Sequence, residues 1–149
     1  MPPGFGDGCT TGARFIAPDK AGIARILDAP DPSERLFWRD KALLEFAYAS
    51  GVRVGELITV KVRDVDLQEG LALVFGKGSR ERIVPLGRAA LQALMVYLRE
   101  IRPVLARNRG EGAVFLNARG TPLTPPVPML GHVTSSYRSA VLGRGFVRR

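Results

Sequence analysis

Hydrophobic residues recur at helical spacing in four stretches of the chain. Helices are predicted at 19–28, 36–49, 53–60 and 87–102. The clearest of them, 36–49, is followed by Ser50-Gly51, and glycine tolerates the left-handed conformation that often ends a helix. The last is followed closely by Pro103, which a helix interior does not accommodate. The helices are expected to share a core that includes Leu43, Leu44, Ala47, Leu57, Leu91 and Leu94.

The pattern changes between residues 71 and 86. Leu71, Leu73 and Phe75 follow the alternating spacing of a strand, and 82–86 predicts a returning strand. The Gly76-Lys77-Gly78-Ser79 segment between them is typical of a tight turn, so we expect a β-hairpin with a lysine at its tip. Residues 114–116 predict one more short strand. The fold class is therefore α+β, a mostly helical domain with a small antiparallel β-sheet.

The two ends of the chain lack this periodicity. Residues 1–14 are rich in glycine and poor in apolar side chains, which predicts a disordered N-terminus. Residues 15–120 carry the predicted folded domain. Residues 121–149 open with four prolines in eight positions and continue with scattered glycines, which predicts a loosely ordered basic tail.

Composition excludes several classes of protein. With 149 residues, 46% hydrophobic and 24% charged, the chain fits one globular domain. No apolar run approaches the roughly 20 residues of a membrane span, so we expect no membrane partner. The single cysteine, Cys9, and the single histidine, His132, exclude a disulfide framework and a Cys/His zinc site, so no metal is expected. The cysteine content fits a cytoplasmic protein.

Positive charge is concentrated in the last third of the chain. Of the net charge of +8, residues 1–100 contribute +1 and residues 101–149 contribute +7. Basic ends often contact nucleic acid, although a solvated arginine-rich tail explains the charge equally well.

Common enzyme motifs do not fit. A Ser–His–Asp or Cys–His site would have to use His132, which lies in the unpatterned tail. The glycines around Lys77 do not have the spacing of a phosphate loop, and a strand fills the gap between them. Asp64 and Asp66 lie between a helix and a strand, where a solvated, capping turn is the default interpretation.

Two segments together carry a more specific signal. Residues 49–57, Ala-Ser-Gly-Val-Arg-Val-Gly-Glu-Leu, are followed by residues 76–86, Gly-Lys-Gly-Ser-Arg-Glu-Arg-Ile-Val-Pro-Leu. In this order and spacing they resemble the catalytic domain of tyrosine recombinases and integrases, especially the bacterial Xer type. The resemblance begins near Pro18, ends near 120–124, and covers about two thirds of the chain.

The resemblance implies a mechanism and roles for particular residues. In this family a tyrosine hydroxyl attacks a DNA phosphate and forms a 3′-phosphotyrosine, which conserves the bond, so no cofactor is needed. Arg53 matches the first catalytic arginine, and Glu56 is expected to orient it. Lys77 matches the hairpin lysine thought to protonate the leaving 5′-oxygen. Arg80 and Arg82 are expected to contact DNA phosphates, although each is equally explained as a solvated surface side chain.

The C-terminal part departs from the family pattern. His132 aligns either with a phosphate-contacting Leu-Gly-His segment or with a damaged His-x-Leu-Arg-His segment, and neither alignment identifies a second catalytic arginine. Tyr137 follows His132 more closely than the family's nucleophile would. We therefore expect an incomplete catalytic domain, produced by truncation, frameshift or internal deletion, that is inactive as this chain.

The function expected from the sequence is site-specific DNA recombination or integration, with duplex DNA as partner and no small-molecule substrate. Other recombinase subunits are expected partners in an intact assembly. Two alternatives stay open: a non-catalytic DNA-binding module and a basic RNA-associated protein.

Overall fold

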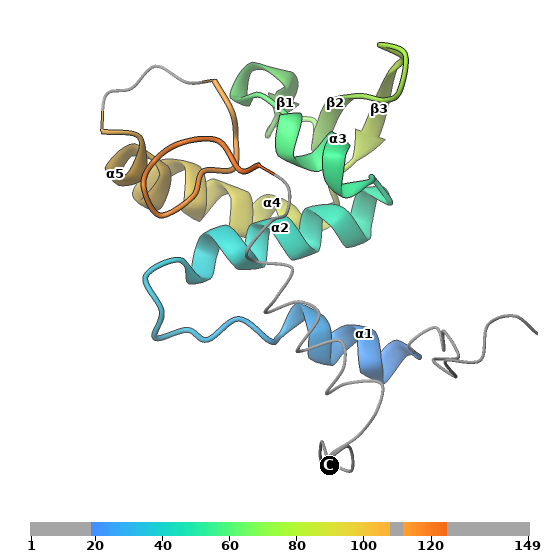
Figure 1. Ribbon diagram of the computed structural model, residues 1–149. Helices are drawn as coiled ribbons and strands as arrows, with labels where there is room; N and C mark the ends of the chain where they lie inside the picture. Colours follow the sequence, from blue (N-terminus) through green and yellow to red (C-terminus); the bar gives the residue numbers. More distant parts are fainter. Residues whose placement is uncertain (1–18, 108–111, 125–149) are drawn as a thin grey trace, which may run out of the picture.

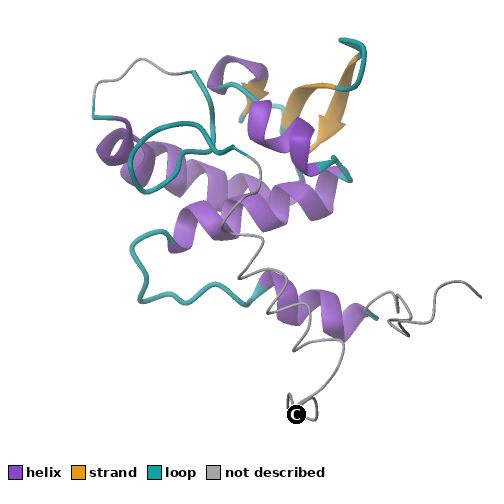
Figure 2. Ribbon diagram, in the orientation of Figure 1, coloured by secondary structure: helices purple, strands orange, loops and turns teal. Residues whose placement is uncertain are grey.

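The computed structural model describes residues 19–107 and 112–124. Its helical elements are α1 (Lys20–Leu27), α2 (Phe37–Ser50), α3 (Val54–Thr59), the 3-10 turn η1 (Val62–Asp64), α4 (Gly87–Val96), the π-helical turn η2 (Tyr97–Ile101) and α5 (Arg102–Ala106). Its strands are β1 (Val65–Asp66), β2 (Leu71–Phe75) and β3 (Glu81–Pro85). The predicted α+β class is confirmed, with one small antiparallel sheet at the upper right of a mostly helical molecule (Figure 1, Figure 2).

The four predicted helices are present, and the last one differs most from its prediction. The stretch expected as one helix over 87–102 consists of α4, η2 and α5, and it continues through Pro103 to Ala106. Pro103 is tolerated because it lies in the first turn of α5, where backbone N–H groups need no acceptor within that helix. The π-helical turn directly before it, η2, changes the hydrogen-bond register at this junction.

The predicted hairpin is confirmed. β2 and β3 pair antiparallel from Leu71 opposite Pro85 to Phe75 opposite Glu81. The sheet order is β1-β2-β3, and β1 was not predicted because two residues are too few to show alternation. The hairpin turn projects past α3 at the upper right of the molecule, away from the α2–α4 pair (Figure 1).

The core lies between α2, α4 and the inner face of the sheet. Leu43, Leu44, Leu57 and Leu94 are buried as predicted, whereas Ala47 and Leu91 pack at its edge. Three aromatic rings at its centre were not predicted. The Phe115 ring stacks on the Tyr97 ring with centroids 5.9 Å apart and meets the Phe46 ring edge-on at 6.1 Å.

Residues 112–124, which we call the anchored segment, carry Phe115 into the core. The strand predicted at 114–116 is wrong, because the ladder contacts here are isolated bridges, Lys61 with Ala113 and Leu116 with Pro122. The Val114 N–H donates to the Val60 carbonyl at 2.9 Å, and side chains from the helices supply further bonds. The Tyr97 hydroxyl donates to the Val114 carbonyl at 2.9 Å and accepts from the Leu116 N–H at 3.1 Å.

Two arginines hold the same segment. Arg39 donates through Nη1 to the Leu116 carbonyl at 3.2 Å. Arg102 donates through Nε and Nη2 to the Ala113 carbonyl at 3.0 and 2.8 Å. These side chains and backbone bonds, such as that from the Leu123 N–H to the Phe115 carbonyl at 3.3 Å, together satisfy the backbone of the anchored segment.

The folded part extends beyond the boundary predicted at residue 120. Leu123 is 5% exposed and belongs to the core, and Leu116 bridges Pro122. The prediction of a loose tail over 121–149 is therefore wrong for residues 121–124, because burial of Leu123 outweighs the local proline content. Residues 125–149, like 1–18, lie outside the described residues.

Candidate nucleic-acid interface

Two segments far apart in the sequence meet in one open groove of about 560 Å³. One is the turn from α2 into α3 together with the first turn of α3, which contributes Gly51, Arg53 and Glu56. The other is the β2–β3 turn with the start of β3. We call this surface the cationic groove, and it is lined by Gly51, Arg53, Glu56, Gly76, Lys77, Arg80, Glu81 and Arg82. Four cations against two carboxylates suit it to an anionic ligand.

The α2–α3 turn places Arg53 at a helix start. Gly51 ends α2 with φ of 62°, and its N–H donates to the Ala47 carbonyl at 3.0 Å. Arg53 then takes an extended conformation as the N-cap residue of α3. The Glu56 carboxylate reaches back to accept from the Arg53 backbone N–H at 3.0 Å, which satisfies one of the donors exposed at the helix start. The exposed Arg53 side chain is thus carried by a capped turn.

The hairpin turn presents Lys77 to solvent. The Gly76 N–H donates to the Arg80 carbonyl at 2.7 Å and closes the base of the turn. Gly78 and Ser79 both have positive φ, 77° and 59°, the sign of φ found at the central residues of type I′ turns. Lys77 and Arg80 on either side of these residues are exposed. The tip therefore offers two cations on a tight turn.

A bidentate ion pair joins the hairpin to α3. Arg82 donates through Nη1 to Glu56 Oε1 at 2.8 Å and through Nη2 to Glu56 Oε2 at 2.7 Å. These bonds, with the one from the Arg53 backbone N–H, lower the pKa of Glu56 to about 2. The same pairing raises the pKa of Arg82. Both groups are thus ionised at neutral pH.

The predicted contact between Glu56 and Arg53 is present in a different form. Glu56 binds the backbone N–H of Arg53, and the guanidinium that it holds is that of Arg82. Strand alternation places Arg82 on the same face of β3 as the buried Val84, but it does not indicate that Glu56 is its partner. The roles of Arg53, Lys77, Arg80 and Arg82 toward DNA stay predictions.

The two tyrosines in the described part of the chain do not line the groove. Tyr97 is buried, with both hydroxyl bonds made to the anchored segment, and burial raises the pKa of its phenol. Tyr48 is 60% exposed on α2. His132, a catalytic candidate from the sequence, and Tyr137, which follows it, lie outside the described residues.

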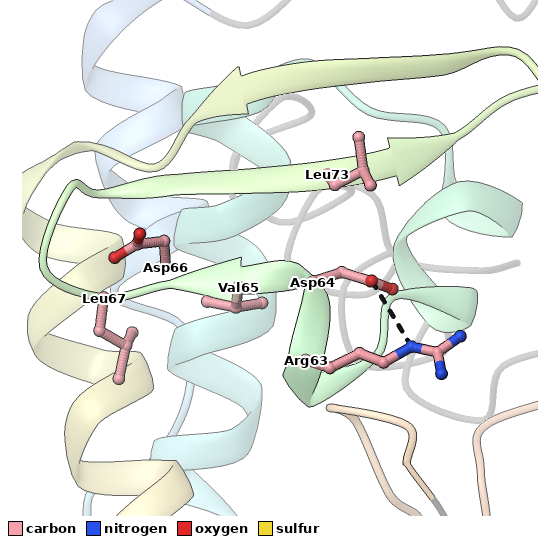
Figure 3. A pocket seen from close by; sticks show the side chains of 6 residues that line it. All are labelled: Arg63, Asp64, Val65, Asp66, Leu67 and Leu73. Carbon is pink, nitrogen blue, oxygen red and sulfur yellow. Dashed lines mark ion pairs between the residues drawn. The ribbon is translucent and has the colours of Figure 1, made fainter.

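A second open pocket, of about 430 Å³, lies beside β1 and is lined by Arg63, Asp64, Val65, Asp66, Leu67 and Leu73 (Figure 3). Its carboxylates have local partners. Arg63 Nε lies 3.8 Å from Asp64 Oδ1, and Asp66 Oδ1 accepts from the Gln68 and Glu69 N–H groups at 2.9 and 3.0 Å. Asp66 therefore has the capping role expected from the sequence.

Residues 19–107 and 112–124 form neither a metal-ligating cluster nor a membrane-spanning helix. No three His, Cys, Asp or Glu side chains gather there as a metal site requires. None of the helices there is long and apolar enough to cross a membrane.

Comparison with known proteins agrees with the geometry. Residues 19–128 match the phage integrase family. The chain is 44% identical over 105 residues to the tyrosine recombinase XerD of Chlorobaculum tepidum, an alignment that covers 68% of this chain and 34% of that protein. The chain thus spans about a third of the length of this curated relative.

Solved structures share the fold. The XerA recombinase superposes with a TM-score of 0.69 at 24% identity, covering 87% of this chain and 44% of that one. The XerH site-specific recombinase, in a pre-cleavage complex with its difH substrate, superposes with a TM-score of 0.69 at 23% identity, covering 86% and 37%.

Proposed function

The chain belongs to the phage integrase family, as a Xer-like tyrosine recombinase catalytic domain, and on this premise we propose that its cationic groove binds the phosphates of duplex DNA in site-specific recombination. The observation that carries the proposal is the meeting of Arg53 and Lys77. They come from separate segments, and both line one groove. XerH, a structural neighbour, was crystallised with its difH substrate.

Each cation suits a different part of the chemistry. A guanidinium is planar and permanently charged, so Arg53 can donate two parallel hydrogen bonds to a phosphate and to the charge that develops on it. An ammonium can give up a proton, so Lys77 can serve the leaving 5′-oxygen. The capped start of α3 holds Arg53, and the tight turn presents Lys77 within the same groove.

We further propose that this chain by itself binds duplex DNA without cleaving it. No tyrosine is among the described residues that line the groove. Cleavage requires a nucleophile in line with the phosphate, and a displacement of about 1 Å can cost about 10²-fold in rate. This observation favours a non-catalytic DNA-binding module as the second candidate function of the isolated chain.

The salt dependence of DNA binding tests whether the cationic groove binds the phosphates. Affinity for a short duplex should fall with salt, with a log–log slope of about −0.9 for each phosphate neutralised. Arg53→Ala and Lys77→Ala should each reduce the slope by about one. Arg99→Ala, which removes an exposed arginine of η2 outside the groove, is the matched control. Affinity that stays flat with salt, or an equal loss in the Arg99 variant, would refute groove binding.

A nicked suicide substrate tests cleavage separately. The chain should yield no protein–DNA adduct that survives denaturing electrophoresis. An adduct that disappears in the Tyr137→Phe variant would instead show that Tyr137 attacks the phosphate and that the chain is a working recombinase.

A further inference from the structure

We infer that Arg82 is a positioning residue that fixes the hairpin against α3, and that it is not one of the phosphate ligands of the groove. The inference rests on the proposed function, because it assigns a role within the same DNA-binding surface. It replaces the expectation from the sequence that Arg82 contacts DNA alongside Arg80.

The first argument is the geometry of the pair. Both oxygens of Glu56 are occupied by the Arg82 guanidinium, at 2.8 and 2.7 Å. The Glu56 side chain is only 12% exposed, whereas that of Arg82 is 44% exposed. A phosphate approaching the terminal nitrogens of Arg82 would therefore compete with a carboxylate already bound in the fork geometry that guanidinium groups favour.

The second argument is the shape of the hairpin around the pair. Gly76 has so little space that an added Cβ would lie 3.1 Å from Glu56 Oε1 and 3.6 Å from Arg82 Nη1. The hairpin backbone therefore lies directly against the ion pair at the base of the turn. Because Gly76 precedes Lys77, the pair holds the backbone from which the Lys77 side chain projects.

The third argument is that Glu56 contacts both halves of the groove. One of its oxygens, Oε2, accepts from the Arg53 backbone N–H and from Arg82 Nη2. The start of α3 and strand β3 are thus tied to one carboxylate. The separation of the Arg53 and Lys77 side chains, on which joint phosphate binding depends, is set through Glu56 and Arg82.

A positioning role and a phosphate-binding role of Arg82 predict opposite effects on DNA binding when its charge or that of Glu56 is removed. If Arg82 is neutralised by Glu56, its removal takes no cation from the set that meets phosphates. If Arg82 binds phosphate, Glu56 is a competitor, and its removal should improve binding. Arg80 provides the comparison, since it is an exposed arginine on the same turn and is not the arginine held by Glu56.

The test is a double-mutant cycle on DNA affinity in the full chain, with Glu56→Ala, Arg82→Ala and the double variant. If Glu56 and Arg82 position the hairpin, both single variants weaken DNA binding by a similar factor, and the double variant binds no more weakly than either. The salt slope of Arg82→Ala then changes by less than one. Stronger binding by Glu56→Ala, or a slope lowered by one in Arg82→Ala as in Arg80→Ala, would overturn the inference.

Amide NMR without DNA keeps the inference testable if binding is too weak to measure. The Glu56→Ala and Arg82→Ala variants should shift the Lys77 and Gly78 amide signals and increase their fast motion, while the remaining spectrum stays that of the folded chain. Arg80→Ala should leave these motions unchanged, and unchanged hairpin signals in all three variants would refute the positioning role. If Arg53→Ala and Lys77→Ala bind DNA normally, the proposed function fails, whereas the NMR result still decides the role of Arg82.

Discussion

The anchored segment and the hairpin turn are both irregular, glycine-containing stretches, yet the molecule holds them in opposite ways. Buried or half-buried side chains from α2, η2 and α5 bond the backbone of the anchored segment at three carbonyls and one N–H. The hairpin turn is held to α3 by the Glu56–Arg82 pair at its base, while its tip is exposed.

The comparison shows that basic side chains either stabilise the fold or remain available to a ligand. Arg39 is 7% exposed, pairs with Asp40 at 2.6 Å and donates to the Leu116 carbonyl, so its charge is committed to the fold. The exposed Arg53, Lys77 and Arg80 line a groove instead. A buried charge must be compensated within the protein, whereas an exposed one can meet an anion from outside. The predictions below test this contrast.

The largest effect is expected from adding one methyl group to the anchored segment. Gly120 has φ of +83°, and a Cβ there would overlap the Leu105 carbonyl. Gly120→Ala should lower the free energy of unfolding by about 3 kcal/mol or more, because backbone strain and overpacking act together. Urea denaturation measures this change.

The matched control for Gly120 lies in the hairpin turn. Gly78 also has a positive φ, +77°, but a Cβ there meets nothing within 4 Å. Gly78→Ala should therefore cost only the backbone strain, about 1–2 kcal/mol. Equal destabilisation by the two substitutions would contradict the contrast between a packed and an open segment.

A smaller effect is expected from Tyr97→Phe. Loss of the hydroxyl leaves the Val114 carbonyl and the Leu116 N–H without their partner, at a cost of about 1–3 kcal/mol. Burial raises the pKa of Tyr97 above its ordinary value of 10.0, so its neutral form stabilises the fold below pH 10. That contribution is lost as the pH rises through the raised pKa.

The pH dependence expected for Tyr97 is measured by comparing the wild type with the Tyr97→Phe variant. The free energy of unfolding of the wild type and of Tyr97→Phe should be measured between pH 9 and 12. The difference between the two proteins should become smaller as the pH rises. Tyr48→Phe, at an exposed position, should follow the wild type throughout. A constant difference would show that the Tyr97 phenol does not titrate with folding.

The sequence predicted elements whose signal is local. Helical and alternating periodicities repeat within ten residues, so they located the helices and the β2–β3 hairpin. The anchored segment has no such period and was predicted in part as a strand and in part as a loose tail. It is held by long-range bonds that no local pattern reveals, those of Arg39, Tyr97 and Arg102 and the backbone bond from Val114 to Val60.

The cationic groove was also predicted only in part. The two motifs indicated that Arg53 and Lys77 belong to one site, and the structure places both along one groove. The partner of Arg82 was not predicted, because Glu56 lies 26 residues earlier in the sequence and is reached only through the tertiary fold. Pairing between distant side chains depends on how α3 packs against the sheet.

The smallest effect on stability, and the sharpest test of the hairpin's attachment, concerns the titration of Glu56. Its pKa is about 2 rather than 4.5, mainly through the Arg82 bonds. A carboxyl whose folded pKa is lowered stabilises the fold above its unfolded pKa, and the contribution is lost as the pH falls from 4.5 toward 2.

Carboxyl carbon NMR should therefore find Glu56 titrating near 2, with the Lys77 and Gly78 amides following it. In Glu56→Gln this shared transition should be absent, whereas Glu81→Gln, on the same hairpin, should retain it. Salt near 1 M, where the Debye length is about 3 Å, should move the Glu56 pKa upward because the pair is partly exposed. A Glu56 titration near 4.5 at low salt would mean that Arg82 does not hold the carboxylate in solution, and that the hairpin turn is attached to the body by the sheet alone.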